Sequence, residues 1–329
     1  MAFQPKFTPK SLPNPTRSSL SSGDRIEVPE IIQATLEDVR PSLITVGASG
    51  TGKTWAILQF LQARLNVLLV DLENKYQTLL RYQPNVVPLG APVTAGGRKR
   101  PPTATEVYNR ILGFIDRLGE GKYREHLGRP IDLIAVDGLM EVGLRIARHY
   151  KDNTPTSKSS GEKNTYAMYD AIGDRLIDVM NSLRTAAGAA SAAYGFPPVG
   201  IYCTVGEERE VNKISGEVSY RALLPGNIGP KFLPYQFEAV VRLSVARDDS
   251  GLPVYVAHLV GDEKFYAKFP GGIYPQAELP NWNMVQVYRD LVEHYRTSGG
   301  TAGASGPAAP LVVGPWKAPE EPPDESNAS

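Results

Sequence analysis

Residues 47–54 constrain the fold of this chain more than any other segment, and they read Gly-Ala-Ser-Gly-Thr-Gly-Lys-Thr. They match the phosphate-binding loop pattern G-x-x-x-x-G-K-[ST] in full. The run 43–46 before them is typical of a β-strand, and the run 55–61 after them is typical of a helix. Because strand, loop and helix follow in the order that the pattern requires, we predict an α/β fold that binds a nucleotide.

The residue types of this loop follow from the chemistry of phosphate binding. Its glycines allow a tight turn in which backbone N–H groups point at phosphate oxygens, and the following helix adds its unsatisfied N-terminal donors. Lys53 is expected to reach the β- and γ-phosphates, and the Thr54 hydroxyl to hold Mg²⁺. The predicted ligands are therefore ATP and Mg²⁺. The loop residues predicted to bind them are Gly47, Ala48, Ser49, Gly50, Thr51, Gly52, Lys53 and Thr54.

Composition narrows the class of protein. An apolar content of 42% is enough for a sizeable core, and no apolar run approaches the length of a membrane span. The formal net charge of zero excludes a bulk attraction to nucleic acid, so any such site must be a local patch. The single cysteine, Cys203, rules out an internal disulfide and suits a reducing cytoplasm; its apolar surroundings predict a core position.

Three segments differ in character along the chain. Residues 1–24 and 298–329 are rich in Pro, Ser, Gly or Ala and are predicted to be disordered, because they cannot bury enough apolar surface. Residues 25–297 are predicted to form a single domain. The second of the two end segments finishes in acidic residues, which suits either a solvated terminus or a tail that binds a protein partner.

Strands and helices alternate in the central segment, which predicts a mainly parallel sheet flanked by helices. Thr103 and Glu106 form a capping-box pair at the start of one helix. From about residue 208 the pattern changes to short antiparallel strands or hairpins. The predicted strands of the first part are 66–71, 131–136 and 199–204, those of the second part are 218–220, 239–245, 254–260 and 265–268, and the predicted helices are 103–119, 166–185 and 283–296.

Three polar residues stand at the ends of buried strands, where the ligands of open α/β sheets bind. Asp137 is a candidate Mg²⁺ ligand. Glu73 is a candidate general base that polarises the attacking water, or else a solvated carboxylate that caps the next helix. Thr204 is a candidate sensor of the γ-phosphate, or else an ordinary β-branched strand residue.

Lys264 and Lys268 flank a short apolar run near the end of the predicted domain. Either lysine could stabilise transition-state charge in a neighbouring subunit, as an arginine finger does, and Lys268 is the candidate catalytic residue of the two. The alternative for both is that edge-strand lysines discourage aggregation.

Taken together, these residues resemble the RecA-like P-loop ATPases. The loop 47–54, the strand end 70–73 and the strand 134–137 follow the pattern of that family in order and approximate spacing, over about residues 40–280. Within the family the chain is most similar to phage-encoded RecA-core ATPases, including single-strand-annealing recombination proteins. Leu-Pro-Gly at 224–226 and Ala-Lys at 267–268 carry this likeness, although Phe-Pro follows where the subgroup has an acidic residue and arginine.

The resemblance implies several properties. Glu73 would be the catalytic base, and the protein would act as a homo-oligomer on single-stranded DNA in the host cytoplasm. Two loops, about 150–165 and 206–231, would contact the DNA, where basic residues alternate with aromatic ones. Solvated loops are the alternative, because acidic residues are interleaved in both. The candidate DNA contacts are Lys151, Lys158, Lys163, Arg209, Lys213 and Arg221.

Three functional hypotheses follow. The first is a DNA-stimulated ATPase of recombination, annealing or replication. The second is a helicase or packaging motor, and the third is an ATP-dependent switch or scaffold that binds a protein partner rather than DNA.

Overall fold

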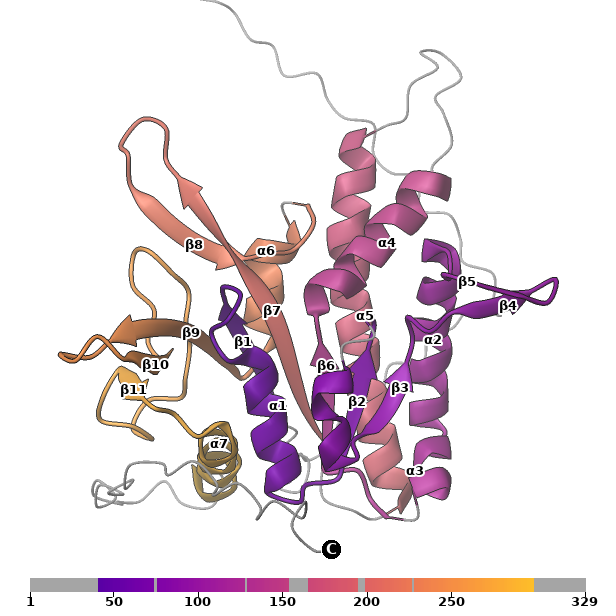
Figure 1. Ribbon diagram of the computed structural model, residues 1–329, viewed down its shortest axis with the longest axis horizontal. Helices are drawn as coiled ribbons and strands as arrows, with labels where there is room; N and C mark the ends of the chain where they lie inside the picture. Colours follow the sequence, from indigo (N-terminus) through magenta and orange to yellow (C-terminus); the bar gives the residue numbers. More distant parts are fainter. Residues whose placement is uncertain are drawn as a thin grey trace, which may run out of the picture. The chain divides into compact units, whose positions relative to one another are not determined.

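A single large sheet organises the protein. The computed structural model describes residues 41–73, 76–127, 129–153, 165–194, 199–226 and 228–298. In this part of the chain, one nine-stranded sheet has the order β11-β10-β9-β1-β7-β6-β2-β3, with β8 paired to β7 alone. Figure 1 shows this sheet between two sets of helices. The strands are β1 (Ser42–Gly47), β2 (Val67–Asp71), β3 (Asn85–Pro88), β6 (Leu133–Asp137), β7 (Gly200–Val211), β8 (Val218–Ala222), β9 (Ala239–Arg247), β10 (Pro253–His258) and β11 (Glu278–Pro280).

Six adjacent strands run parallel, so that their carboxyl ends meet at one edge: β9, β1, β7, β6, β2 and β3. β1 pairs with β7, β7 with β6, and β6 with β2, all in parallel register. β7 therefore lies between β1, which leads into the loop 47–54, and β6, which ends in Asp137. This order brings residues from three separate strands to one side of the sheet.

Alternate side chains of each strand enter two different cores. On one face, Ile44, Ile134 and Ile201 pack against α2, α4 and α5; on the other, Leu43 and Tyr202 pack against α1 and α7. Because successive side chains of a strand point to opposite faces, a strand that is buried on both faces must be apolar throughout. This is why the central strands read as continuous apolar runs.

Helices cover both faces of the sheet, as Figure 1 shows. α2 begins with the predicted capping box: the Thr103 side chain accepts from the Glu106 N–H, and the Glu106 side chain accepts from the Thr103 N–H. The helical segments are α1 (Lys53–Gln62), η2 (Tyr76–Tyr82), α2 (Ala104–Gly119), α3 (Lys122–Leu127), α4 (Leu139–Asn153), α5 (Thr165–Tyr194), α6 (Ile228–Phe232), η3 (Leu233–Gln236) and α7 (Met284–Ser298).

The later strands extend the same sheet. β9 pairs in parallel with β1, whereas β10 and β11 follow in antiparallel register. The expected antiparallel hairpin is therefore formed by β9 and β10, and β9 in addition joins the edge of β1 in parallel. The segment 265–268, expected to be a strand, forms only two isolated bridges, Tyr220 to Phe265 and Val240 to Lys268.

Two hairpins extend away from the sheet (Figure 1). β7 continues beyond its neighbours and turns back as β8. The basic run Gly-Arg-Lys-Arg at 97–100 lies in a second hairpin, formed by β4 (Val93–Ala95) and β5 (Arg98–Arg100). Arg100 binds Glu106 there at 2.6 Å, and this hydrogen bond holds the pKa of the Glu106 carboxyl at about 2.

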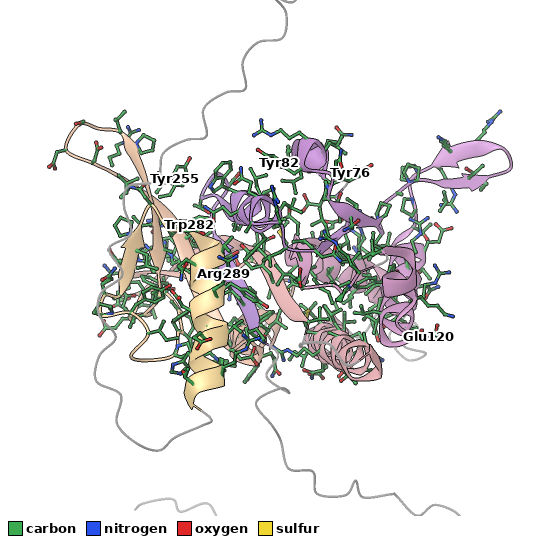
Figure 2. The ribbon with its side chains drawn as sticks, turned by 90° about the horizontal axis from the view of Figure 1, so that it is seen from below. Tyr76, Tyr82, Glu120, Tyr255, Trp282 and Arg289 are labelled. Atoms are coloured by element: carbon green, nitrogen blue, oxygen red, sulfur yellow. The ribbon has the colours of Figure 1, made fainter. Side chains whose placement is uncertain are left out.

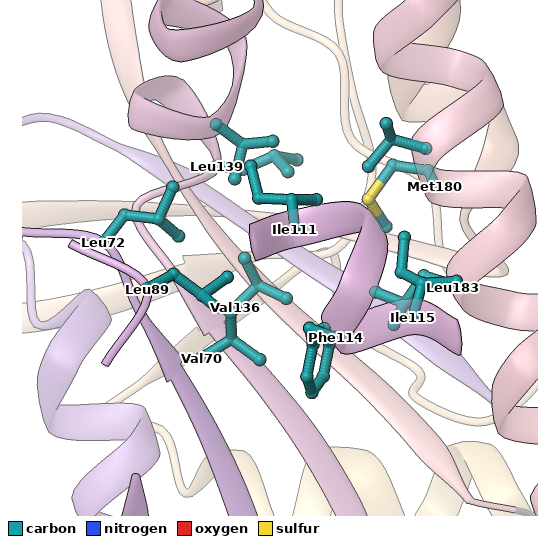
Figure 3. A pocket seen from close by; sticks show the side chains of 12 residues that line it. Val70, Leu72, Leu89, Ile111, Phe114, Ile115, Val136, Leu139, Met180 and Leu183 are labelled. Atoms are coloured by element: carbon teal, nitrogen blue, oxygen red, sulfur yellow. The ribbon is translucent and has the colours of Figure 1, made fainter. Parts of the chain in front are cut away.

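A small apolar cavity lies where α2, α4 and α5 meet β2 and β6 (Figure 3). Its twelve lining side chains are all apolar, among them Ile111, Phe114, Val136 and Met180. A site with no polar group cannot orient a phosphate or a metal ion, so this cavity belongs to the core.

The predicted fold class is confirmed: an α/β fold with a mainly parallel sheet, flanking helices and antiparallel strands near its end. The predicted helix 166–185 and strand 199–204 are both longer than expected, as α5 and β7. The segment 1–24 and all but the first residue of 298–329 lie outside the described residues, so the domain bounds stay predictions. Among the helices that are described, none has the length and apolar character needed to cross a membrane.

Candidate functional site

The loop 47–54 joins β1 to α1 at the carboxyl edge of the sheet, as its pattern predicts. Gly50 and Gly52 have φ angles of 82° and 94°, a left-handed conformation that favours glycine. Gly47 is required for a different reason: a Cβ atom there would lie 2.5 Å from Oγ1 of Thr51 and 2.7 Å from the Leu243 carbonyl oxygen. The loop is therefore packed tightly against β9 at Gly47, while Gly50 and Gly52 allow its left-handed turns.

The Lys53 side chain folds back onto the start of this loop. Its ammonium group donates to the carbonyl oxygens of Gly47 and Ala48, each at 2.7 Å. The Thr51 hydroxyl also donates to the Ala48 carbonyl, at 2.9 Å. These bonds hold a positive charge beside the N-terminus of α1, and both features attract an anion.

Three side chains from separate segments converge beside Lys53. The Thr204 hydroxyl on β7 donates to Oδ1 of Asp137 at 2.6 Å, and the Thr54 hydroxyl of α1 donates to Oδ2 at 3.3 Å. The Gly138 N–H in turn donates to the Thr204 hydroxyl at 2.9 Å. Asp137 thus links the phosphate loop to the ends of β6 and β7.

Burial raises the pKa of the Asp137 carboxyl, while hydrogen bonds from Thr204 and Thr54 act in the opposite direction. The carboxylates of Glu73 and Asp71 raise it further by repulsion. A cation placed beside Asp137 would reverse that effect, because opposite charge stabilises the ionised form.

Glu73 lies over the residue that follows Asp137. Its Oε1 atom is 3.0 Å from the position that a Cβ atom would take at Gly138, whose φ is 90°. The Glu73 N–H donates to Oδ1 of Asp71 at 3.0 Å, and Oδ2 of Asp71 accepts from the Tyr76 N–H. Buried Asp71, opposite Asp137 in the sheet register, therefore fixes the turn that presents Glu73.

Tyr202 lies beneath the phosphate loop and is fully buried. Its hydroxyl is 2.8 Å from the Thr45 hydroxyl and donates weakly, at 3.5 Å, to the carbonyl oxygen of Lys53. Burial raises the pKa of Tyr202 far above its usual value, so the group stays neutral. It connects β1, β7 and the first turn of α1 below the loop.

The other predicted catalytic residue is elsewhere. Lys268 pairs with Val240, three positions before Leu243, the partner of Gly47. It therefore lies toward the amino ends of β1 and β9, away from Lys53. Burial lowers the pKa of Lys268, and Glu238 opposes that effect. Lys268 does not join the site of its own chain, and its predicted action on a neighbouring subunit stays a prediction.

The candidate DNA contacts are scattered. Lys151 is exposed at the end of α4, and Arg209 and Lys213 are exposed on the β7–β8 hairpin. Arg221 is paired with Glu208 at 3.1 Å and with Glu210 at 3.5 Å. Lys158 and Lys163 lie outside the described residues.

Four residues near the loop are not among the residues predicted from the sequence: Asp71, Tyr202, Tyr255 and Trp282. Asp71 carries the strongest signal of the four, since it ends a buried strand just before Glu73. Tyr202 lies in an apolar strand, and its hydroxyl partners depend on the strand order. Tyr255 and Trp282 are distant in the chain from the loop, and the residues next to them in the sequence form no motif that connects them with it.

No family model matches the chain, and no curated protein matches it. Among solved structures, a prototypical ATPase from the type III secretion system of pathogenic bacteria is similar over 62% of this chain and 52% of its own, at 13% identity and a TM-score of 0.37.

The assembled ATPase EscN from the type III secretion system of enteropathogenic E. coli is similar over 62% of this chain and 43% of its own, at 12% identity and a TM-score of 0.34. The chain thus spans about half or less of each of these structures. Such distant likeness carries no argument about function, and the fold class rests on the strand order described above.

Proposed function

We propose that this protein binds and hydrolyses ATP with the help of Mg²⁺. The observation that carries the proposal is the convergence of Lys53, Thr54 and Asp137, from two separate segments, at the carboxyl edge of a parallel sheet. A loop of inward N–H groups, a lysine and a carboxylate at this edge suit the phosphates of a nucleotide.

The donor set fits Mg²⁺. This ion prefers oxygen ligands and is commonly held by one or two protein groups together with substrate phosphates. The Thr54 hydroxyl and the Asp137 carboxylate provide such oxygens, 3.3 Å apart. The described residues contain no group of three or more His, Cys, Asp or Glu side chains placed to hold a metal ion, so a cage made wholly of protein is absent from them. When bound, Mg²⁺ would neutralise phosphate charge.

We assign to Glu73 the role of orienting the water molecule that attacks the γ-phosphate. Its carboxylate lies beside Asp137 at the same edge, and its backbone is fixed by Asp71. A carboxylate in this place would orient a water molecule for in-line attack on the γ-phosphate and accept its proton. Lys53 would stabilise the charge on the transferred group.

The test is Lys53→Ala, with Lys99→Ala as the matched control. Lys99 is exposed on β5, in a hairpin remote from the loop, so the control removes the same charge without touching the site. Phosphate release and ATP binding are measured for both. We expect Lys53→Ala to lose hydrolysis with an unchanged circular dichroism spectrum. Equal hydrolysis by both variants would overturn the proposal.

We further propose that single-stranded DNA is the partner, acting through the β7–β8 hairpin. This hairpin continues the strand that carries Thr204, so an occupant of the hairpin is physically linked to the Asp137 cluster. Arg209 and Lys213 supply exposed positive charge on it. Hydrolysis should rise when single-stranded DNA is added.

The alternative is a protein partner, and the mixed charge of the hairpin favours it. Arg221 is paired with Glu208 and Glu210, which lowers the attraction of this surface for phosphates. For DNA, replacing Arg209 and Lys213 by alanine should reduce the slope of log affinity against log salt by about 0.7 for each phosphate that is no longer neutralised. A slope near zero in wild type would favour the protein partner.

A homo-oligomer is part of the same proposal, because Lys268 lies too far from the loop of its own chain to act there. Sedimentation in the presence and absence of ATP tests assembly. Lys268→Ala should lower hydrolysis only under conditions where the protein is assembled, and an equal loss in the monomer would argue against action between subunits.

A further inference from the structure

Two aromatic side chains close one flank of the phosphate loop. A Cβ atom at Gly52 would lie 3.1 Å from Cζ2 of Trp282 and 3.7 Å from Cδ1 of Tyr255. Figure 2 labels both aromatic residues, which lie near each other. Gly52 directly precedes Lys53, so these rings stand next to the end of the loop from which α1 begins.

The position of Trp282 is fixed from two directions. Its carbonyl oxygen accepts from the Gln59 side chain of α1 at 3.4 Å, and the neighbouring Met284 N–H donates to Oε1 of Gln59 at 2.7 Å. On the other side, the Asn281 N–H donates to the carbonyl oxygen of Tyr255 at 2.7 Å. Trp282 and Tyr255 are therefore held together against the loop before any ligand binds.

Trp282 carries a buried donor without a partner. The residue is 6% exposed, and its Nε1 atom has no hydrogen-bond partner among the described residues. Nε1 and Cζ2 are bonded to the same ring carbon, so this donor lies on the side of the indole that faces Gly52. A buried donor left unpaired is costly and calls for an explanation, and an acceptor supplied by a ligand is one.

Tyr255 has the opposite character, because it is 42% exposed although its ring reaches the loop. An exposed tyrosine beside the buried Trp282 offers a surface on which a base can stack. Aromatic side chains stack on nucleobases without strong base preference, because every base has a π-face.

We propose that Tyr255 and Trp282 form the nucleoside end of the nucleotide site. Tyr255 stacks on the base, and the Trp282 indole N–H donates to an acceptor of the base or ribose. This inference rests on the proposed function and names its substrate class: a nucleoside triphosphate rather than a simple polyphosphate. The phosphates occupy the loop 47–54, and the base extends past Gly52 toward β10.

The test compares two ligands that share their phosphates. Binding of ATP and of inorganic tripolyphosphate is measured by calorimetry, in Mg²⁺, for wild type, Tyr255→Ala, Tyr255→Phe and Tyr235→Ala. Tyr235 is the matched control, an exposed tyrosine on η3 that packs on Tyr266. We expect Tyr255→Ala to weaken ATP binding about 5-fold to about 100-fold, the range of an aromatic–base stack, and to leave tripolyphosphate binding unchanged.

The other variants sharpen this result. Tyr255→Phe should bind ATP like wild type, since the ring is kept, and so should Tyr235→Ala. Trp282→Phe, which keeps an aromatic ring but removes the N–H, should weaken ATP binding and not tripolyphosphate binding.

Two results would overturn the inference. In one, Tyr255→Ala binds ATP like wild type; in the other, it loses ATP and tripolyphosphate equally, which would make Tyr255 a support of the loop. Failure of the proposed function looks different, because wild type itself would then not bind ATP, or Lys53→Ala would bind and hydrolyse it normally.

Discussion

Thr204 and Asp137 are joined by a 2.6 Å hydrogen bond across the neighbouring ends of β7 and β6. Thr204 also accepts from the Gly138 N–H, so one hydroxyl fixes both the carboxylate and the turn that follows it. β7 runs on from Thr204 into the β7–β8 hairpin. This single side chain therefore connects the candidate Mg²⁺ ligand with the surface to which we assign the partner.

Thr204→Val should destabilise the protein and impair hydrolysis. The variant keeps the shape but leaves the Gly138 N–H without its acceptor and removes the Thr204 donor to Oδ1 of Asp137, at a cost of about 1–3 kcal/mol. It should also raise the pKa of Asp137, because the bond from Thr204 lowers it. Urea unfolding measures the stability, and Thr204→Ser, which retains the hydroxyl, should behave like wild type. Equal stability of the valine and serine variants would contradict this role.

Glu73→Gln should separate binding from chemistry. The amide preserves the size of the side chain but cannot accept a proton, so hydrolysis should fall about 10²-fold to about 10⁴-fold while ATP binding is retained. Single-turnover phosphate release and equilibrium binding measure the two. Glu263→Gln, at an exposed loop position, is the matched control. Normal turnover by Glu73→Gln would show that another group orients the water.

Two glycines of the loop should respond differently to alanine. The methyl group added by Gly50→Ala has no atom within 4 Å. The substitution should therefore lower the free energy of unfolding only by the cost of a left-handed backbone at a residue with a side chain, about 1–2 kcal/mol. Gly47→Ala places its methyl group 2.7 Å from the Leu243 carbonyl oxygen, so β1 and β9 must separate. Thermal unfolding should show the larger loss for Gly47→Ala. A larger loss for Gly50→Ala would show that the loop is less tightly packed on β9 than described.

Cys203 should be inert in the folded protein. Burial raises the pKa of its thiol to about 12, so the reactive thiolate is scarce at neutral pH. A thiol-reactive dye should label the chain only after unfolding, and rapid labelling in native buffer would contradict the burial. The thiol of the unfolded chain ionises above about pH 8.5, whereas the thiol of the folded chain keeps its proton. The free energy of unfolding should therefore fall as the pH rises from about 8.5 toward about 12.

Local patterns predict much of the fold because their signals lie within a few residues. The capping box of Thr103 and Glu106 marks the start of α2, and the apolar run at 67–71 marks a strand buried on both faces. The length of β7 exceeds its prediction because its outer half is polar and pairs only with β8. The predicted antiparallel pairing of β9 with β10 is confirmed, whereas its parallel pairing with β1 was not predicted, because no residue of the strand itself specifies a partner so distant in the chain.

The phosphate loop could be recognised from the sequence alone, since its eight residues are contiguous and each glycine, lysine and threonine serves the local turn or the phosphates. The sequence also placed Glu73 and Asp137 at strand ends. Three spatial relationships become visible only in the folded chain: Thr204 donates to Asp137, Lys268 lies away from the loop, and Trp282 packs on Gly52. These relationships depend on the order of strands in the sheet, which is set by packing of the whole core rather than by neighbours in the chain.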